Sequence, residues 1–173
     1  MTEGEERELL ALVASLDFHE IRMHGVVARR TTAHFGVLYG YQSRKVEPAA
    51  PIPEGLVSLR DRCAGLAGVD PPERFVEALI TRYPPGAGIG WHRDAPMFGS
   101  RVAGVSLGGA ARMRFRRDGH EPHVLPLEPR SAYVLAGEAR WQWQHTIPAG
   151  KQLRYSITFR TLHQPEIGAV GVG

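Results

Sequence analysis

Two histidines and one aspartate have the residue types and spacing of a metal site. His92 and Asp94 stand two positions apart in the segment IGWHRD, so at the end of a β-strand both side chains would point toward one place. His145 lies much later in the chain, on another predicted strand that a folded-back sheet can return to the same place. Two imidazoles and one carboxylate form the facial triad that binds non-haem iron(II) and leaves coordination positions open. A hydrogen-bonded His–Asp pair without a metal is the alternative interpretation.

A second pattern lies in the segment LRYSITFR. Arg154, Ser156, Thr158 and Arg160 alternate along it, so a β-strand would turn all four side chains to one face. Two guanidinium groups on an inward face require an acidic partner, because an unpaired buried charge is strongly unfavourable. A dicarboxylate that chelates iron at one end and accepts an arginine fork at the other meets this requirement. A solvent-facing strand with ordinary alternation is the alternative.

Two amphipathic helices are predicted in the first part of the chain. Thr2 and Glu5 form a capping box, after which apolar residues recur with helical spacing at Leu9, Leu12, Val13 and Leu16. Pro53 stands where a second helix could start, and its pattern ends at the breaker GVDPP, residues 68–72. Both helices are expected to pack on the outside of a sheet.

Short β-type segments fill the chain beyond residue 73, separated by turn residues such as the pair Asp118 and Gly119. The predicted fold is mainly β (α+β): a double-stranded β-helix, or jelly-roll and cupin-like barrel, with two N-terminal helices packed on the outside. We expect one domain over residues 1–173, with the helices in 1–72, the β-barrel in 73–162 and a flexible tail in 163–173.

Composition and charge bear on the partners and the compartment. The net charge is +3, and among 21 basic residues only Lys45 and Lys151 are lysines. Arginine binds phosphate in a bidentate way and stacks on bases, which suits a nucleic-acid partner, although a solvated basic surface explains the same composition. The single cysteine, Cys63, excludes an intramolecular disulfide. Because no signal segment or membrane-length apolar run is evident, we expect a cytoplasmic monomer without a membrane partner.

Taken together, two segments resemble the AlkB family of iron(II) and 2-oxoglutarate dioxygenases. They are LITRYPPGAGIGWHRD and QHTIPAGKQLRYSITFR, within a match that covers roughly residues 26–162. The resemblance implies that Fe(II) is bound by His92, Asp94 and His145. It further implies that Tyr83 and Arg154 bind 2-oxoglutarate with Ser156 nearby, and that Arg160 lies close to both the metal and the substrate.

The same resemblance implies a reaction and a class of substrate. Oxidative decarboxylation of 2-oxoglutarate by O₂ would drive hydroxylation of an N-alkyl carbon, and the product would collapse to an aldehyde and the dealkylated amine. The usual substrate of the family is an alkylated base in DNA or RNA, flipped out of its stack into a pocket. The expected reaction is therefore oxidative dealkylation of methyl or etheno adducts, in alkylation-damage repair or RNA demethylation.

Residues 29–41 resemble the nucleotide-recognition lid of the family. Arg29 and Arg30 could meet phosphates, and the aromatic rings of Phe35, Tyr39 and Tyr41 could stack on a base. The alternative is a β-ribbon whose aromatic side chains simply cover the barrel.

Two departures from the family pattern widen the range of substrates. Pro96 stands where several DNA-repair members have an acidic residue, and Ser156 stands where many have asparagine. These features resemble members with RNA or other substrates. A dioxygenase acting on methylated protein or a small molecule is therefore the alternative, and a non-catalytic nucleic-acid-binding module is a lesser one.

Overall fold

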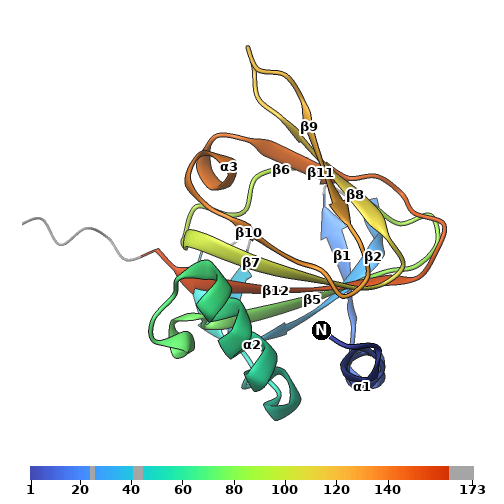
Figure 1. Ribbon diagram of the computed structural model, residues 1–173, viewed down its shortest axis with the longest axis vertical. Coiled ribbons are helices and arrows are strands. Elements are labelled where there is room, and N and C mark those ends of the chain that lie inside the picture. The colour runs from blue at the N-terminus through green and yellow to red at the C-terminus, as the bar shows by residue number, and fades with distance from the viewer. Residues whose placement is uncertain (24–25, 41–44, 164–173) are drawn as a thin grey trace, which may run out of the picture.

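Two antiparallel sheets face each other and form most of the molecule (Figure 1). The computed structural model describes residues 1–23, 26–40 and 45–163. The major sheet has the strand order β1 (His19–Met23), β2 (Val26–Phe35), β5 (Glu77–Tyr83), β12 (Arg154–Leu162), β7 (Phe98–Gly108) and β10 (Ala132–Leu135). The minor sheet has the order β6 (Ile89–His92), β11 (Gln144–Ile147), β8 (Ala111–Arg116) and β9 (His123–Leu127). A two-stranded ribbon, β3 (Val37–Gly40) and β4 (Lys45–Pro48), completes the β-structure.

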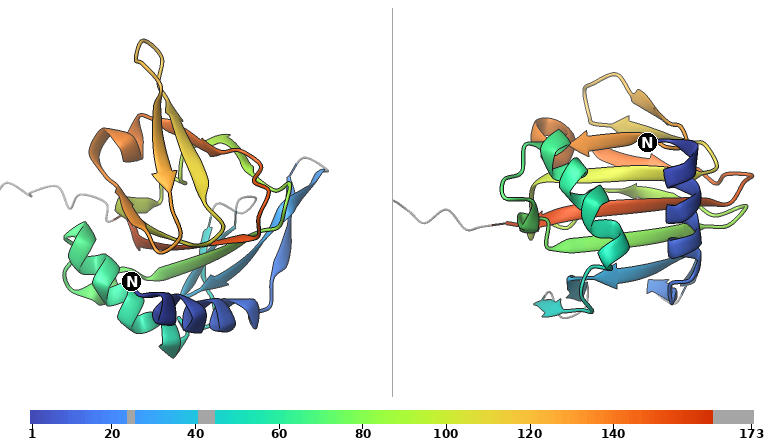
Figure 2. Two further views of the ribbon diagram at one scale, coloured as in Figure 1. Left: turned by 45° about the vertical axis from the view of Figure 1, so that its right-hand side comes forward. Right: turned by 60° about the horizontal axis from the view of Figure 1, so that its bottom comes forward.

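Both predicted helices are present and pack against the outer face of the major sheet (Figure 2). Helix α1 (Glu3–Ala14) begins with the predicted capping box: the Glu5 amide donates to the Thr2 hydroxyl and the Thr2 amide donates to the Glu5 carboxylate. Helix α2 (Glu54–Ala67) follows Pro53 and ends at Gly68, whose φ of 64° is the left-handed conformation that glycine adopts most easily. The predicted mainly β jelly-roll with two outer helices is confirmed.

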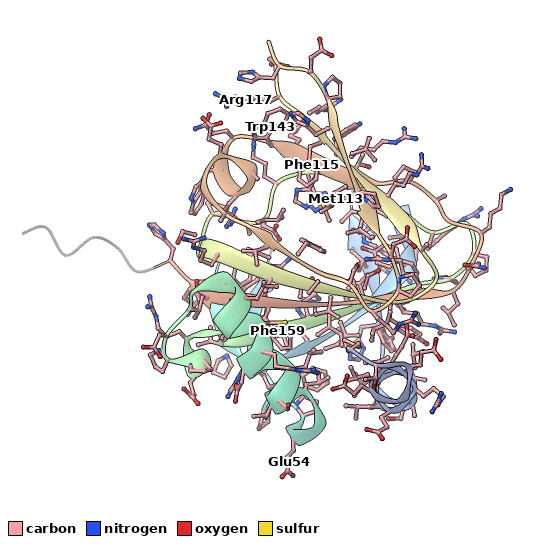
Figure 3. The ribbon with its side chains drawn as sticks, in the orientation of Figure 1. Glu54, Met113, Phe115, Arg117, Trp143 and Phe159 are labelled. Atoms are coloured by element: carbon pink, nitrogen blue, oxygen red, sulfur yellow. The ribbon has the colours of Figure 1, made fainter. Side chains whose placement is uncertain are left out.

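Apolar side chains form two separate cores. The first lies between the helices and the major sheet and includes the fully buried Val13, Leu56, Ile80, Ile157 and Phe159. The second lies between the two sheets and is built from Val102, Met113, Phe115, Leu127, Leu135, Trp143 and Ile147 (Figure 3). Because the second core fills only part of the space between the sheets, the rest is open to polar side chains.

Two local expectations were wrong. Only β-type segments and turns were expected beyond residue 73, but a short helix, α3 (Gly137–Trp141), precedes the strand of His145, and Trp141 lies exposed at the helix end. The helix is stabilised by Arg140, because its guanidinium donates hydrogen bonds to backbone carbonyls at Asp94 and in the loop that follows it. The predicted boundary at residue 73 is also no break in the sheet, since β2 pairs directly with β5 and residues 29–35 continue the major sheet.

The remaining connections are short. A 3-10 turn, η1 (Pro72–Arg74), leads from α2 into β5. Among the described residues, no helix is both long and apolar enough to cross a bilayer.

Candidate metal and co-substrate site

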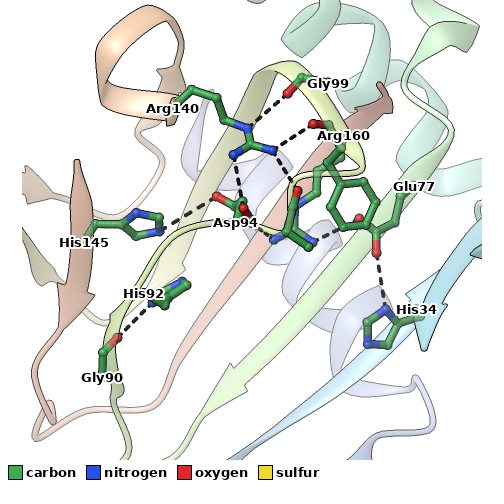
Figure 4. Close-up of polar contacts among 11 residues, drawn as sticks. His34, Glu77, Gly90, His92, Asp94, Gly99, Arg140, His145 and Arg160 are labelled. Carbon is green, nitrogen blue, oxygen red and sulfur yellow. Dashed lines mark hydrogen bonds and ion pairs between the residues drawn. The ribbon is translucent and has the colours of Figure 1, made fainter. Parts of the chain in front are cut away.

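His92 and His145 face each other across two paired strands. Strands β6 and β11 are antiparallel, and their register sets His145 opposite His92, with ring centroids 4.3 Å apart. Asp94 follows the end of β6, and its Oδ2 lies 3.9 Å from Nε2 of His145 (Figure 4). The structure thus brings together the three residues whose spacing predicted a metal site.

The protonation states of these residues suit metal binding. Burial, together with the neighbouring His92, lowers the pKa of His145 to about 4, and burial also lowers the pKa of His92. Burial alone would raise the pKa of Asp94, but the Arg160 guanidinium and other positive neighbours bring it below its usual value. Two neutral imidazoles and one carboxylate are therefore present near neutral pH, which is the form in which these groups bind a metal.

Hydrogen bonds fix part of this arrangement. Nδ1 of His92 lies 2.8 Å from the carbonyl oxygen of Gly90, and if Nδ1 donates there, its Nε2 keeps a free lone pair. Nδ1 of His145 is buried and has no hydrogen-bond partner within the described structure. Among the described residues, no three His, Cys, Asp or Glu side chains are already positioned around one ion. Two imidazoles and one carboxylate are the donor set that fits iron(II), and His92, Asp94 and His145 are the residues that would hold it.

Arg160 links Asp94 to a second buried carboxylate. Its Nη2 donates to Oδ1 of Asp94 and its Nη1 to Oε2 of Glu77, the latter at 3.0 Å. Glu77 is 1% exposed, and its other oxygen lies 3.4 Å from Nδ1 of His34. Glu77 was not singled out from the sequence, although a glutamate within the apolar run FVEALI was an available signal. Two carboxylates thus compensate the charge of Arg160 and hold it beside Asp94.

Arg154 is the clearest indication of an acidic ligand. It is 3% exposed, and its Nε donates to the hydroxyl of Ser106 at 3.0 Å. Its two terminal nitrogens, Nη1 and Nη2, are buried without a hydrogen-bond partner among the described residues. The guanidinium lies 5.2 Å from the ring centre of Tyr83. Because a buried guanidinium without a counter-ion is costly, a carboxylate from outside the chain is the partner that fits.

Tyr133 lies on the same side of the cavity and was missed from the sequence. Its ring extends over Gly104 of the adjacent strand, where a Cβ would lie only 2.4 Å from the tyrosine oxygen. Burial raises the pKa of Tyr133 well above its ordinary value, so its hydroxyl stays protonated and can donate a hydrogen bond. Positive charge from Arg154 acts on this hydroxyl. Nothing in the run SAYVLAG distinguishes this ring from a packed core aromatic.

One cavity of about 1050 Å³ joins these groups. Its walls include the three candidate ligands together with Tyr83, Tyr133, Ser156 and Arg160, while Arg154 is not a lining residue and lies next to Tyr83. Both sheets contribute to the lining. The volume is at the upper end of small-molecule sites and leaves room for a co-substrate and part of a second molecule.

A family model described as the 2OG-Fe(II) oxygenase superfamily matches residues 14–160 of this chain. The chain belongs to the 2OG-Fe(II) oxygenase superfamily. Its members use Fe(II), 2-oxoglutarate and O₂, and the chain is accordingly an oxidative dioxygenase.

The relatives are of the AlkB type, as the two sequence segments predicted. The chain is 29% identical over 154 residues to a mouse protein named tRNA (carboxymethyluridine(34)-5-O)-methyltransferase ALKBH8, covering 85% of this chain and 23% of the relative. It is 28% identical over 180 residues to an Arabidopsis thaliana protein named alkylated DNA repair protein ALKBH8 homolog, covering 87% of this chain and 49% of that protein. The chain therefore spans about a quarter to a half of these two relatives.

A solved structure supports the fold. The structure of OsALKBH1 superposes with a TM-score of 0.67 at 16% identity, covering 93% of this chain and 92% of the other. At this identity the likeness is evidence for the dioxygenase fold alone.

The predicted lid residues of this AlkB-type dioxygenase are only partly gathered at the cavity. Arg30 and Phe35 line it, and Phe35 also packs against the first core. Arg29 is exposed and lies near Gly86, away from the lining residues. The side chain of Tyr39 and the whole of Tyr41 lie outside the described residues.

Arg140 is a further residue that the sequence did not reveal. It is 2% exposed and donates to the backbone carbonyls of Asp94, Ala95, Phe98 and Gly99 at 2.8 to 3.2 Å. The carbonyls of Asp94 and Ala95 belong to the loop that joins β6 to β7, and those of Phe98 and Gly99 are at the start of β7. Arg140 therefore fixes the backbone on which the Asp94 carboxylate stands. Only tertiary structure reveals this, because the contacts span more than forty positions of sequence.

Proposed function

We propose that this dioxygenase removes N-linked alkyl groups from bases of DNA or RNA. In this proposal His92, Asp94 and His145 bind the iron, while Arg154, Tyr83 and Ser156 bind 2-oxoglutarate with Arg160 beside the metal. The observation that carries the proposal is that a candidate metal-ligand set and an unpartnered buried guanidinium occur near the same cavity. A two-histidine, one-carboxylate set lines the cavity, and the buried Arg154 guanidinium, whose terminal nitrogens have no partner among the described residues, lies next to the lining residue Tyr83.

The chemistry divides between the bound groups and the chain. When bound, iron and 2-oxoglutarate supply with O₂ the oxidation of a substrate C–H bond, with release of succinate and CO₂. The side chains would orient these groups: in this proposal the Arg154 guanidinium and the protonated Tyr133 hydroxyl donate to the distal carboxylate, which the unpartnered terminal nitrogens of Arg154 support. Met113, Leu135 and Ile147 line the cavity and limit the access of water. Hydroxylation at an N–CH₃ carbon gives N–CH₂OH, which breaks down to formaldehyde and N–H.

A nucleic-acid substrate is supported by three observations. The cavity is larger than 2-oxoglutarate alone requires, so a flipped base fits as the second occupant. Basic side chains, including Arg30 and Arg93, stand among its lining residues. The names of the relatives concern tRNA in one case and alkylated DNA in another. Because the chain spans only part of those proteins, the methyltransferase activity in one name is not proposed for it.

The test is direct turnover on defined lesions. Iron-loaded protein is incubated with 2-oxoglutarate and DNA and RNA oligonucleotides that carry methyl or etheno adducts, and mass loss is read by mass spectrometry. The expected result is loss of the adduct mass with wild type and none with His92→Ala, whereas His120→Ala, an exposed histidine outside the cavity, behaves as wild type. Succinate release without loss of any adduct would overturn the proposed substrate and direct the search to methylated protein or small molecules.

A further inference from the structure

The outer face of the minor sheet carries a row of exposed arginines. Along β8, Met113 and Phe115 point into the second core, so Arg112, Arg114 and Arg116 alternate on the opposite, solvent side. All three are exposed. Together with Trp91 of β6 we call them the arginine face. Successive arginines of a strand stand about 6.8 Å apart, since a strand rises about 3.4 Å per residue.

Little in the described structure neutralises this charge. The four strands of the minor sheet contain no aspartate or glutamate, and Arg112 and Arg114 form no ion pair within the described residues. The acidic residues closest in sequence to β8 and β9 are Asp118, Glu121 and Glu128, which stand in the loops at the ends of these strands. Helices α1 and α2 cover the other sheet, so neither covers this face (Figure 2). The face is therefore positive and accessible.

An aromatic ring accompanies the arginines. The Arg116 guanidinium lies 4.4 Å from the ring centre of Trp91, and its Nε donates to the side-chain oxygen of Gln144 at 2.9 Å. Trp91 is 37% exposed, which is unusual for so large an apolar side chain. A flat ring beside fixed guanidinium groups offers a surface on which a base can stack.

The arginine face continues into the candidate site. Trp91 immediately precedes His92 on β6, an edge strand of the minor sheet, so the two side chains point to opposite faces of that strand. Trp91 and Arg93 are nevertheless among the residues that line the cavity. A polymer crossing this edge strand would touch the outer face with one segment while another segment enters the cavity.

We propose that the arginine face binds the phosphate backbone of a single nucleic-acid strand whose neighbouring nucleotide enters the cavity; this rests on the proposed function. Arginine suits the role because its planar guanidinium matches phosphate and does not lose its charge. A single strand fits better than a small anion, because the three arginines repeat in a line on the scale of successive phosphates. An anionic membrane, which would need no such continuity with the cavity, is an outcome that the test separates.

The test compares two triple variants with the same change in net charge. Arg112→Gln, Arg114→Gln and Arg116→Gln neutralise the face, whereas Arg7→Gln, Arg62→Gln and Arg74→Gln neutralise three exposed arginines on the helix-covered side. Binding of a short, unmodified, fluorescein-labelled single strand of DNA or RNA is followed by anisotropy at several salt concentrations. Using an unmodified strand keeps this measurement independent of dealkylation.

We expect the face variant to lose about tenfold or more in affinity and its log–log salt slope to fall by about 2, since each phosphate contact on a single strand contributes about 0.7. The control variant should stay within about twofold of wild type. Equal losses in both variants, or no loss in the face variant, would overturn the proposal. The proposal would also be overturned if the face variant lost binding to phosphatidylserine vesicles while its oligonucleotide binding stayed intact.

The two proposals fail in different ways. If strand binding depends on the face but no adduct is removed, the binding surface stands and the proposed substrate fails. If the face variant removes adducts as well as wild type does, at both limiting and saturating oligonucleotide, the proposed dealkylation stands. The proposal that the arginine face binds the strand then fails. Succinate release without oligonucleotide should be unchanged in both triple variants and reports that the site is intact.

Discussion

The two sheets differ in what covers them and in what they contribute to the cavity. The major sheet has helices on its outer face and supplies Tyr83, Arg154, Ser156 and Arg160 from its central strands. The minor sheet has an exposed, arginine-bearing outer face and supplies His92 and His145 from β6 and β11. Asp94 stands on the loop that leads from β6 to β7, between the two sheets.

This difference separates two tasks. The major sheet is buried on both faces, which allows it to hold charged groups at low exposure, such as Arg154 and the Glu77–Arg160 pair. The minor sheet has no such layer of helices on its outer face. Arg140 stabilises the loop around Asp94 by donating hydrogen bonds to its backbone carbonyls. We call the surroundings of Arg154 the candidate co-substrate end, which is stabilised by packing, and the surroundings of Asp94 the candidate metal end, which is stabilised by a few hydrogen bonds.

The largest effect is expected from Arg154→Met, which tests the major-sheet end. Losing a buried charged partner of a carboxylate costs about 4 kcal/mol, so the KM for 2-oxoglutarate in succinate release should rise about a thousandfold. The free energy of unfolding of the ligand-free protein should be unchanged or higher, because the terminal nitrogens of Arg154 have no partner to lose. Arg130→Met, which removes the ion pair with Glu6, should do the reverse. Unfolding of Arg154→Met at markedly lower urea would contradict the assignment.

Arg140→Met tests the metal end and should cost about 3 kcal/mol of unfolding free energy. Four backbone carbonyls lose their donor at once, although the loop can relax toward water and limit the loss. Affinity for Mn(II), a redox-inactive substitute for iron, should fall as well because Asp94 loses its fixed backbone. Urea unfolding and metal titration measure the two effects. Arg117→Met, at the neighbouring ion pair with Glu138, serves as the control and should affect neither strongly.

These two variants also show where prediction from sequence succeeded and where it stopped. The alternation of Arg154 and Arg160 could be seen in the sequence because a strand fixes side-chain direction with a period of two. The roles of Arg140, Glu77 and Tyr133 could not, since each depends on a partner brought close only by the sheet register. The short helix α3 was hidden for the same reason, as its stabilising contacts are with a distant loop.

The helical part shows the opposite case. The capping box at Thr2 and the Gly68 terminus are local devices, so the sequence predicted them with their boundaries. The candidate lid was harder, because the β-forming residues 29–35 suit a separate ribbon and a strand of the main sheet equally well. Pairing of β2 with β5 decided between them.

Acidification from about pH 6.5 to about pH 5 should lower the free energy of unfolding of the metal-free protein by about 2 kcal/mol, at about 1.36 kcal/mol per pH unit. Because the pKa of His145 is lowered to about 4 from an ordinary value near 6.5, the unfolded chain binds a proton in that interval that the folded chain excludes. Stability is therefore full above pH about 6.5 and falls as the pH drops toward 4. Urea unfolding with a chelator present measures this slope, and His145→Gln should flatten it while His120→Gln does not. A wild-type profile without slope in this interval would contradict the burial of a neutral His145.

The smallest effect tests the covering helices. Thr2→Ala removes the cap of α1 and should cost about 1 kcal/mol of unfolding free energy, as caps usually do. The KM for 2-oxoglutarate should not change, because α1 lies on the far side of the major sheet from the cavity. A shift in KM larger than about twofold would show that the helix layer and the co-substrate end are not independent.

The most direct test of the account is the affinity for 2-oxoglutarate measured calorimetrically with and without Mn(II). If one co-substrate spans both ends of the cavity, binding should be strong only when the metal and Arg154 are both present, and metal and 2-oxoglutarate should raise each other's affinity by the same factor. Wild type should then bind tightly with Mn(II), while His145→Ala and Arg154→Met should each lose most of that affinity. Equal affinity with and without Mn(II), or full affinity in Arg154→Met, would contradict the two-ended site.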